Sequence, residues 1–160
     1  MRILGIDPGY ATLGWAVIDS DFKIIDCNFI GTESGLKIDE RLLKIYSGIT
    51  GLINKYNPNC LAIERLFFTK NAKTAIDVAK CIGVILLTAK LNQLDYNEYS
   101  PSHVKTAITG YGRASKDQIQ NIIMKIYKLK KIPRPDDVAD ALAIAACHFL
   151  STKQTRSYNI

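Results

Sequence analysis

The sequence predicts an α/β fold, with a mixed five-stranded sheet and helices on both of its faces. Three apolar segments separated by short turns, at 2–7, 13–18 and 22–30, are typical of an antiparallel meander. Two more short strands, at 60–63 and 95–99, alternate with segments of helical periodicity. A meander followed by β-α units predicts a mixed sheet that helices cover on both faces.

Helical periodicity of the apolar residues predicts four helices, at 38–56, 71–92, about 119–126 and about 136–150. In the first of them, Leu42, Ile45, Ile49 and Ile53 recur on one face, and Pro58 ends the helix. The sequence SPSH, directly after the fifth strand, predicts a turn or a short helix.

These elements form one domain at 1–150, followed by a polar tail at 151–160 that we expect to be loose. A chain of 160 residues with 48% hydrophobic residues can bury its own core. The longest apolar run, at 81–87, is too short to span a membrane, and the early acid Asp7 argues against a signal peptide. These two observations predict a cytosolic protein. The four cysteines are scattered, so we expect buried free thiols.

Charge is unevenly distributed along the chain. Residues 1–100 carry 11 Lys or Arg and 11 Asp or Glu, whereas residues 101–160 carry 10 Lys or Arg and only 4 Asp or Glu. The net charge of +6 therefore belongs to the last third, and indicates either a polyanionic partner or a solvated basic surface. Three of the four acids in that third are Asp136, Asp137 and Asp140, which suggests a cation site beside a phosphate track.

Two further carboxylates fall at the ends of predicted strands. Asp7 closes the first strand and precedes Pro8-Gly9, so one interpretation is a cap on a tight turn. Glu64 follows the apolar strand CLAI, where an exposed charged residue is common. The other interpretation is that both belong to a site, because α/β proteins gather functional groups at the carboxyl edge of the sheet.

Asp136, Asp137 and Asp140 lie at the start of the last predicted helix. Acids in a first turn complement the helix dipole, which accounts for one of the first two but not for Asp140. Asp137 and Asp140 share a helix face at a spacing of three, and Asp136 and Asp140 at a spacing of four, so periodicity leaves both pairs open. Such like charges repel, and a hard cation such as Mg²⁺ would turn repulsion into ligation.

Four stretches of the sequence match a known family in order and spacing. They are MRILGIDPGYATLGWAVID at 1–19, LAIERLFFTKN at 61–71, YSPSHVKTAITGYGRASKDQ at 99–118 and DDVADALAIA at 136–145. Together they resemble the RuvC family of bacterial Holliday junction resolvases, across essentially the whole chain. The resemblance implies an RNase H-like nuclease domain that resolves four-way junctions by paired symmetric nicks, in recombination and DNA repair.

The resemblance also implies a metal-dependent active site. Asp7, Glu64, Asp137 and Asp140 match the family's catalytic carboxylates, which hold two Mg²⁺ or Mn²⁺ ions. The match selects Asp137 over Asp136, because the family pattern is D-x-x-D-A-L-A.

The resemblance implies DNA contacts by Phe67, Lys105 and Lys116, and the basic last third adds Arg113 as a further predicted contact. Phe67 matches an aromatic residue expected to stack on an unpaired base near the crossover, with a place in the core as the alternative. Lys105 and Lys116 match lysines near the scissile phosphate, which implies a catalytic role, with a solvated side chain as the alternative for each.

The partners that the resemblance implies are four-way junction DNA, a second copy of the chain, and the branch-migration proteins RuvA and RuvB. The predicted helix at 71–92 carries Ala72, Ala75, Ala79 and Gly83 near helical spacing. That stripe of small residues predicts close packing, either on the sheet or on the second copy of a homodimer.

Three other functions fit parts of the pattern. An actin-like or sugar-kinase ATPase shares the GIDPG opening, but needs two such domains and more than 160 residues. A related RNase H-like RNA nuclease would share the carboxylates. A junction-binding module without catalysis would share the basic surface, although the complete set of carboxylates argues against it.

Overall fold

The protein is described by a computed structural model that covers residues 1–66 and 72–157, with side chains except at 72–73 and 154–157. Within these ranges the chain forms five strands and five helices. They are β1 Ile3–Asp7, β2 Thr12–Ile18, β3 Ile24–Gly31, α1 Ile38–Tyr56, β4 Cys60–Glu64, α2 Ala72–Leu91, β5 Tyr96–Tyr99, α3 Pro101–Thr109, α4 Lys116–Ile126 and α5 Asp136–Ser157.

The sheet has the strand order β3-β2-β1-β4-β5. β1, β2 and β3 form the expected antiparallel meander, whereas β4 pairs with β1, and β5 with β4, in parallel. The predicted mixed five-stranded sheet is therefore confirmed. Because β1, β4 and β5 run in the same direction, their carboxyl ends lie at one edge of the sheet.

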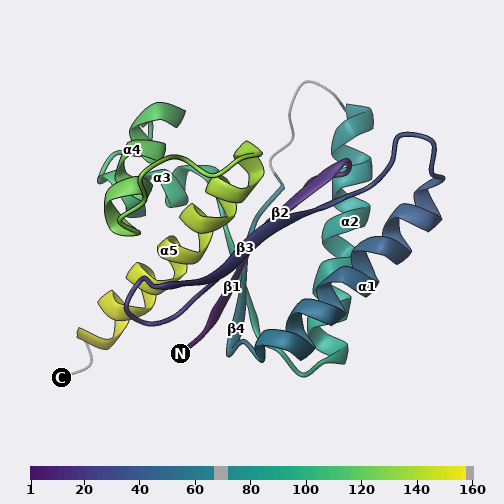
Figure 1. Ribbon diagram of the computed structural model, residues 1–160, viewed down its shortest axis with the longest axis horizontal. Coiled ribbons are helices and arrows are strands. Elements are labelled where there is room, and N and C mark those ends of the chain that lie inside the picture. Colours follow the sequence, from purple (N-terminus) through teal and green to yellow (C-terminus); the bar gives the residue numbers. More distant parts are fainter. Residues whose placement is uncertain (67–71, 158–160) are drawn as a thin grey trace.

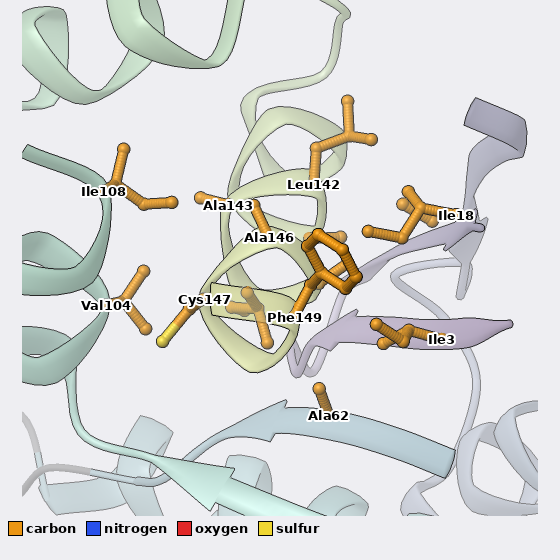
Figure 2. Packing of buried hydrophobic residues seen from close by; sticks show 14 of the residues in the cluster. Ile3, Ile18, Ala62, Val104, Ile108, Leu142, Ala143, Ala146, Cys147 and Phe149 are labelled. Carbon is orange, nitrogen blue, oxygen red and sulfur yellow. The ribbon is translucent and has the colours of Figure 1, made fainter. Parts of the chain in front are cut away.

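Helices cover both faces of this sheet, as the sequence predicts. Figure 1 shows α1 and α2 against one face, and α5 against the other with α3 and α4 beyond it. Side chains of β1 alternate between the two layers: Leu4 and Ile6 belong to the core with α1 and α2, and Ile3 to the core with α5. In Figure 2, α5 lies between the strands that carry Ile3 and Ala62 and the helix that carries Val104.

Two strand glycines let α5 approach the sheet closely. A Cβ atom added at Gly5 would lie 2.4 Å from the backbone oxygen of Ala141 and 2.8 Å from the Cβ of Ala145. A Cβ atom at Gly14 would lie 2.0 Å from the backbone oxygen of Asp137. Any side chain at either position would collide with α5, so these glycines determine how near the first turns of α5 come to β1 and β2.

A buried polar cluster ties α5 to the parallel strands. His148 lies with Nε2 3.1 Å from Cys60 Sγ on β4 and with Nδ1 2.8 Å from Tyr99 Oη on β5. Both ring nitrogens thus have partners inside the core, as a buried imidazole requires. Burial lowers the pKa of His148, so the ring is neutral, and it orients α5 without adding a buried charge.

The structure decides between the two alternatives for SPSH, and it differs from the expected end of the last helix. The SPSH sequence opens α3, a helix of nine residues, because Ser100 accepts a hydrogen bond from the His103 N–H and Pro101 occupies the first turn. Helix α5 continues to Ser157, beyond the expected end at 150 and into the segment predicted to be a loose tail.

The expectation of free cysteines fits the structure. The cysteines are free, and Cys60, Cys81 and Cys147 are buried. No helix in the described ranges is both long enough and apolar enough to cross a membrane.

Candidate active site

Asp7 and Glu64 end neighbouring parallel strands and point to the same face of the sheet. β1 and β4 pair with Ile6 opposite Ile63, so the next residues in register are Asp7 and Glu64. Cys60 and Ala62 of β4 contribute to the core on the α5 side, and alternation places Glu64 on that side too. The same alternation carries Asp7 to the face on which Gly5 meets α5.

Helix α5 brings two more carboxylates to this edge. Asp137 is in its first turn, where the close approach at Gly14 holds the backbone against β2. Asp140 follows one turn later, and it lines a cavity together with Glu64. The strand ends and the start of α5 therefore bring all four predicted carboxylates to one region.

Electrostatics supports this grouping. Burial, and then the charges of Asp140, Glu64 and Asp137, raise the pKa of Asp7 to about 8, against a smaller opposing effect of Lys116. Asp7 is thus protonated at neutral pH unless a cation compensates for its neighbours. A carboxyl group with so high a pKa, among other acids at a sheet edge, is a typical feature of functional sites.

Glu64 and Asp140 have raised pKa values for the same reasons. Burial and the charge of Asp140 raise the pKa of Glu64, while the positive charge of Lys105 opposes the shift. Burial also raises the pKa of Asp140, and the charge and hydrogen bond of Lys116 oppose it. Lys105 therefore opposes the pKa shift of Glu64, and Lys116 opposes those of Asp7 and Asp140.

Lys116, the first residue of α4, contacts two acids of α5. Its ammonium nitrogen lies 3.0 Å from Asp136 Oδ2 and 3.3 Å from Asp140 Oδ2. The other carboxylate oxygen of Asp136, Oδ1, accepts a hydrogen bond from the Arg134 guanidinium. The three aspartates at the start of α5 thus have different surroundings. Asp136 forms ion pairs with Lys116 and Arg134, whereas the charges of Asp137 and Asp140 raise the pKa of Asp7.

The donor set fits a hard divalent cation. Carboxylate oxygens are the ligands that such ions take, and a cation would offset the repulsion that raises the pKa of Asp7. As the side chains stand, no group of three or more His, Cys, Asp or Glu among residues 1–66 and 72–157 is arranged to hold a metal ion. In this arrangement the Lys116 ammonium partly offsets the charge of Asp140.

A cavity of about 240 Å³ lies beside the carboxylates. Charged groups and apolar groups both line it. The residues are Glu64, Lys105, Lys116 and Asp140, with Pro101, Val104, Ile119, Ala143 and Ile144. The combination of acids and lysines around one hollow suits a phosphate that reaches metal ligands and ammonium groups together.

The other predicted site residues have varied positions. Arg113 is exposed in the turn between α3 and α4, where the structure gives it no role in the carboxylate group. Phe67 lies outside the described residues. In the predicted stripe on α2, Ala75 is buried, Ala79 and Gly83 are exposed, and the side chain of Ala72 is outside the described part.

Sequence reasoning missed two features of the site. The first is the pairing of Asp136 with Lys116 and Arg134, which no local pattern announces because Lys116 is 20 positions away in the sequence. The second is the role of Gly5 and Gly14. Their place inside apolar strands was the available signal, because an interior strand glycine often marks a close approach of another backbone.

Taken together, this sheet topology and the acids at the carboxyl edge define a nuclease of the RNase H-like class. The sequence matches the family model "Crossover junction endodeoxyribonuclease RuvC" over residues 3–148. The chain belongs to the RuvC family.

Relatives of the same family match almost from end to end. The crossover junction endodeoxyribonuclease RuvC of Caldicellulosiruptor saccharolyticus is 51% identical over 156 residues, which are 95% of this chain and 94% of that protein. The corresponding protein of Halothermothrix orenii is 47% identical over 161 residues, with 99% and 98% covered. The family resemblance expected from the sequence motifs is therefore confirmed.

Solved structures agree with the fold. Thermus thermophilus RuvC, in complex with a Holliday junction substrate, is similar with a TM-score of 0.92 at 30% identity, covering 97% of this chain and 96% of that one. The yeast mitochondrial Holliday junction resolvase Ydc2 has a TM-score of 0.72 at 15% identity, covering 98% and 81%. The latter likeness supports the fold alone, and the RNase H-like prediction is confirmed.

Proposed function

We propose that this chain resolves four-way DNA junctions by nicking opposed strands at the carboxylate group of β1, β4 and α5. The observation that carries the proposal is the convergence of four acids and two lysines at one sheet edge, where burial and the neighbouring acids raise the pKa of Asp7 to about 8. Family membership supplies the substrate class, because the Thermus thermophilus relative is described with a Holliday junction.

Asp7, Glu64, Asp137 and Asp140 would hold the cations of such a reaction through their oxygen atoms. When bound, two divalent cations, Mg²⁺ or Mn²⁺, supply an acidified water nucleophile and compensate the charge on the leaving oxygen. The water oxygen forms a bond to phosphorus while the bond from phosphorus to the 3′ oxygen breaks. The products are a 5′-phosphate and a 3′-hydroxyl.

Lys105 and Lys116 would position the scissile phosphate. Both line the cavity beside Glu64 and Asp140, so a phosphate there meets ammonium groups and metal ligands at once. Positive charge at this place is worth more when the phosphate accumulates charge in the transition state. Arg113, exposed between α3 and α4, would contact the DNA backbone further from the reacting phosphate.

A homodimer would present two such sites to the two equivalent strands of a junction. A symmetric dimer forms its interface from the same surface patch of both copies, and the centre of such a patch is often apolar. Helix α2 has an exposed apolar stripe formed by Ile76, Leu87 and Leu91, which are 57%, 59% and 64% exposed, with the exposed Gly83 between them. We infer that this stripe forms the dimer contact.

Phe67 would give the site its preference for unpaired bases. It follows Glu64 by three positions in the sequence, and the family resemblance assigns it to the site. Stacking of a base on an aromatic ring contributes about 1–3 kcal/mol, enough to favour a splayed crossover over paired duplex. Action in the cytoplasm stays a prediction from the sequence, and contacts with RuvA and RuvB stay predictions of the family resemblance.

Incision of three substrates tests the proposal. The protein is incubated with Mg²⁺ and a synthetic four-way DNA junction, a linear duplex of the same sequence, or a structured RNA of similar size. We expect paired nicks in the junction and little cleavage of the other two. Cleavage of the RNA in preference to the junction would assign the site to an RNA nuclease, and tight junction binding without any incision would leave a binding module.

A further inference from the structure

Lys116 is shared between two carboxylates that belong to different surroundings. Its ammonium lies 3.0 Å from an oxygen of Asp136 and 3.3 Å from an oxygen of Asp140. Asp140 belongs to the acidic group, since it lines the cavity with Glu64 and its charge acts on Asp7. Asp136 has a further cationic partner instead, because its second oxygen accepts a hydrogen bond from the Arg134 guanidinium.

The two contacts respond differently to a cation. A divalent ion bound by Asp140 takes oxygen electron pairs that the Lys116 ammonium uses, and it repels the ammonium. The contact with Asp136 is unaffected, because that carboxylate already has two cationic partners and need not move. When Asp140 binds the metal, Lys116 therefore still has Asp136 as a partner, and its ammonium stays beside the cavity.

We propose that Asp136 is a positioning residue that retains Lys116 at the edge of the site, so that Asp140 is released to the cation while the ammonium remains available to the phosphate. The inference rests on the proposed function, since it assumes that Asp140 is a metal ligand. It gives the neighbouring acids Asp136 and Asp137 separate tasks, one toward a lysine and one toward the cation site.

Loss of the Asp136 charge should weaken metal binding through Lys116. In Asp136→Asn the ammonium is left with Asp140 as its partner, so an incoming cation has to displace it. The contact is partly exposed, with side chains 49% and 37% accessible, and such pairs are modest in strength. We therefore expect the dissociation constant for Mn²⁺ to rise about two- to fivefold. Asparagine keeps the size and shape of aspartate, but only one of its two terminal atoms can accept a hydrogen bond, so it cannot serve Lys116 and Arg134 together.

Calorimetric titration of the DNA-free protein with Mn²⁺ tests this, using Asp136→Asn, Lys116→Met and the double variant. Asp136→Asn should weaken binding, Lys116→Met should tighten it, and the double variant should bind like Lys116→Met alone, since Asp136 acts through the lysine. Asp136→Glu should bind like the wild type. The control Asp117→Asn removes one exposed acid from the first turn of α4, and so reports the general effect of net charge.

Two results would overturn the inference. If Asp136→Asn weakened Mn²⁺ binding no more than Asp117→Asn, the effect would be that of net charge. If Asp136→Asn weakened binding equally with and without Lys116, Asp136 would act directly on the cation. Both leave the proposed function standing, which fails separately if the wild-type protein neither binds Mn²⁺ nor cuts the junction.

Discussion

Asp7 carries a carboxyl group that the fold buries among other acids. Folding places its carboxyl group under α5, and three other acids lie near enough to oppose its ionisation. The folded protein without metal therefore favours the protonated form up to about pH 8, whereas the unfolded chain ionises near the ordinary value of 3.8. Metal-free stability should depend on pH for this reason.

The sign of that dependence follows from the raised pKa. The stability contributed by protonated Asp7 is present in full below pH 3.8, and it is lost as the pH rises through about 8. Residue 7 cannot ionise in Asp7→Asn. The unfolding free energy of this variant, relative to that of the wild type, should therefore increase by about 1–3 kcal/mol from about pH 5 to pH 8. Chemical denaturation in a chelating buffer at several pH values measures the difference.

Asp21→Asn, an exposed acid in the turn before β3, is the control for that experiment. Its stability should follow the wild type at every pH. Adding Mg²⁺ at about pH 8 should stabilise the wild type more than Asp7→Asn, because only the wild type regains a compensated carboxylate. A wild-type protein that keeps pace with Asp7→Asn across the whole range would show that Asp7 is not held among like charges.

Phe67 provides a second prediction at the residue scale. If its ring stacks on an unpaired base, Phe67→Ala should slow junction cleavage at least about fivefold, which corresponds to the lower end of about 1 kcal/mol for the loss of a stacked base. Phe67→Tyr and Phe67→Trp should restore most of the rate, since stacking requires a ring and not one particular ring. Nicking rates and a thermal melt of the three variants decide the matter. A folded Phe67→Ala that cuts at the wild-type rate excludes the stacking role.

At the scale of elements, the site depends on how closely α5 approaches the sheet. Asp140 directly precedes Ala141, whose backbone oxygen would lie 2.4 Å from a Cβ at position 5. A shift of α5 away from β1 would therefore carry Asp140 away from Asp7 and Glu64. The contact of α5 with β1 at Gly5 therefore keeps the carboxylates close together.

Gly5→Ala tests that contact. The added methyl group collides with backbone atoms that cannot rotate away, so we expect a loss of about 1–3 kcal/mol in unfolding free energy together with strongly reduced cleavage. The matched control is Gly51→Ala in α1, where an added Cβ meets nothing within 4 Å. There alanine should stabilise by up to about 1 kcal/mol and leave cleavage unchanged. A fully active Gly5→Ala would contradict the dependence of the site on α5.

Local sequence patterns predicted most of this architecture because strand alternation, helical periodicity and turn residues are local signals. The strands and α1 fall where those signals place them, and the identity of Asp7 and Glu64 as strand-end acids was visible as well. Local patterns could not decide between Asp136 and Asp137, because helical spacing admits both. What separates them is their contact with α4 and with the sheet, and such contacts across the fold leave no trace in a local pattern.

The lengths of α3 and α5 could not be predicted from local patterns either. α3 was expected as a turn or a short helix, since its cap at Ser100 was readable but its length depends on burial of Val104 and Ile108 against α5. The continuation of α5 to Ser157 was missed because the residues after 150 are polar, and polarity alone predicted a loose tail.

At the scale of the whole molecule, the exposed apolar stripe of α2 predicts the oligomeric state. If Leu87 is buried between two copies, Leu87→Glu places a charge in that contact twice and should raise the dimer dissociation constant by more than about tenfold. Leu43→Glu on α1, an exposed leucine as well, is the control and should leave the dimer intact. Sedimentation velocity over a concentration series measures both.

Cleavage should follow the oligomeric state in the same variants. A Leu87→Glu monomer would keep its carboxylates but lose the coordinated pair of nicks, because each junction would meet one site at a time. If Leu43→Glu dissociated the protein and Leu87→Glu did not, the interface would lie on α1 and the assignment to α2 would be wrong.

The most direct test of the central claim compares binding and incision of one four-way junction by five carboxylate variants in Mg²⁺. Asp7→Asn, Glu64→Gln, Asp137→Asn and Asp140→Asn should each reduce incision at least about a thousandfold while they still bind the junction, since phosphate contacts hold the DNA and the acids serve the reaction. Asp136→Asn should cut within about fivefold of the wild type, because its charge acts on Lys116. Incision by Asp137→Asn together with inactivity of Asp136→Asn, or near-normal incision by any of the first four, would contradict the account.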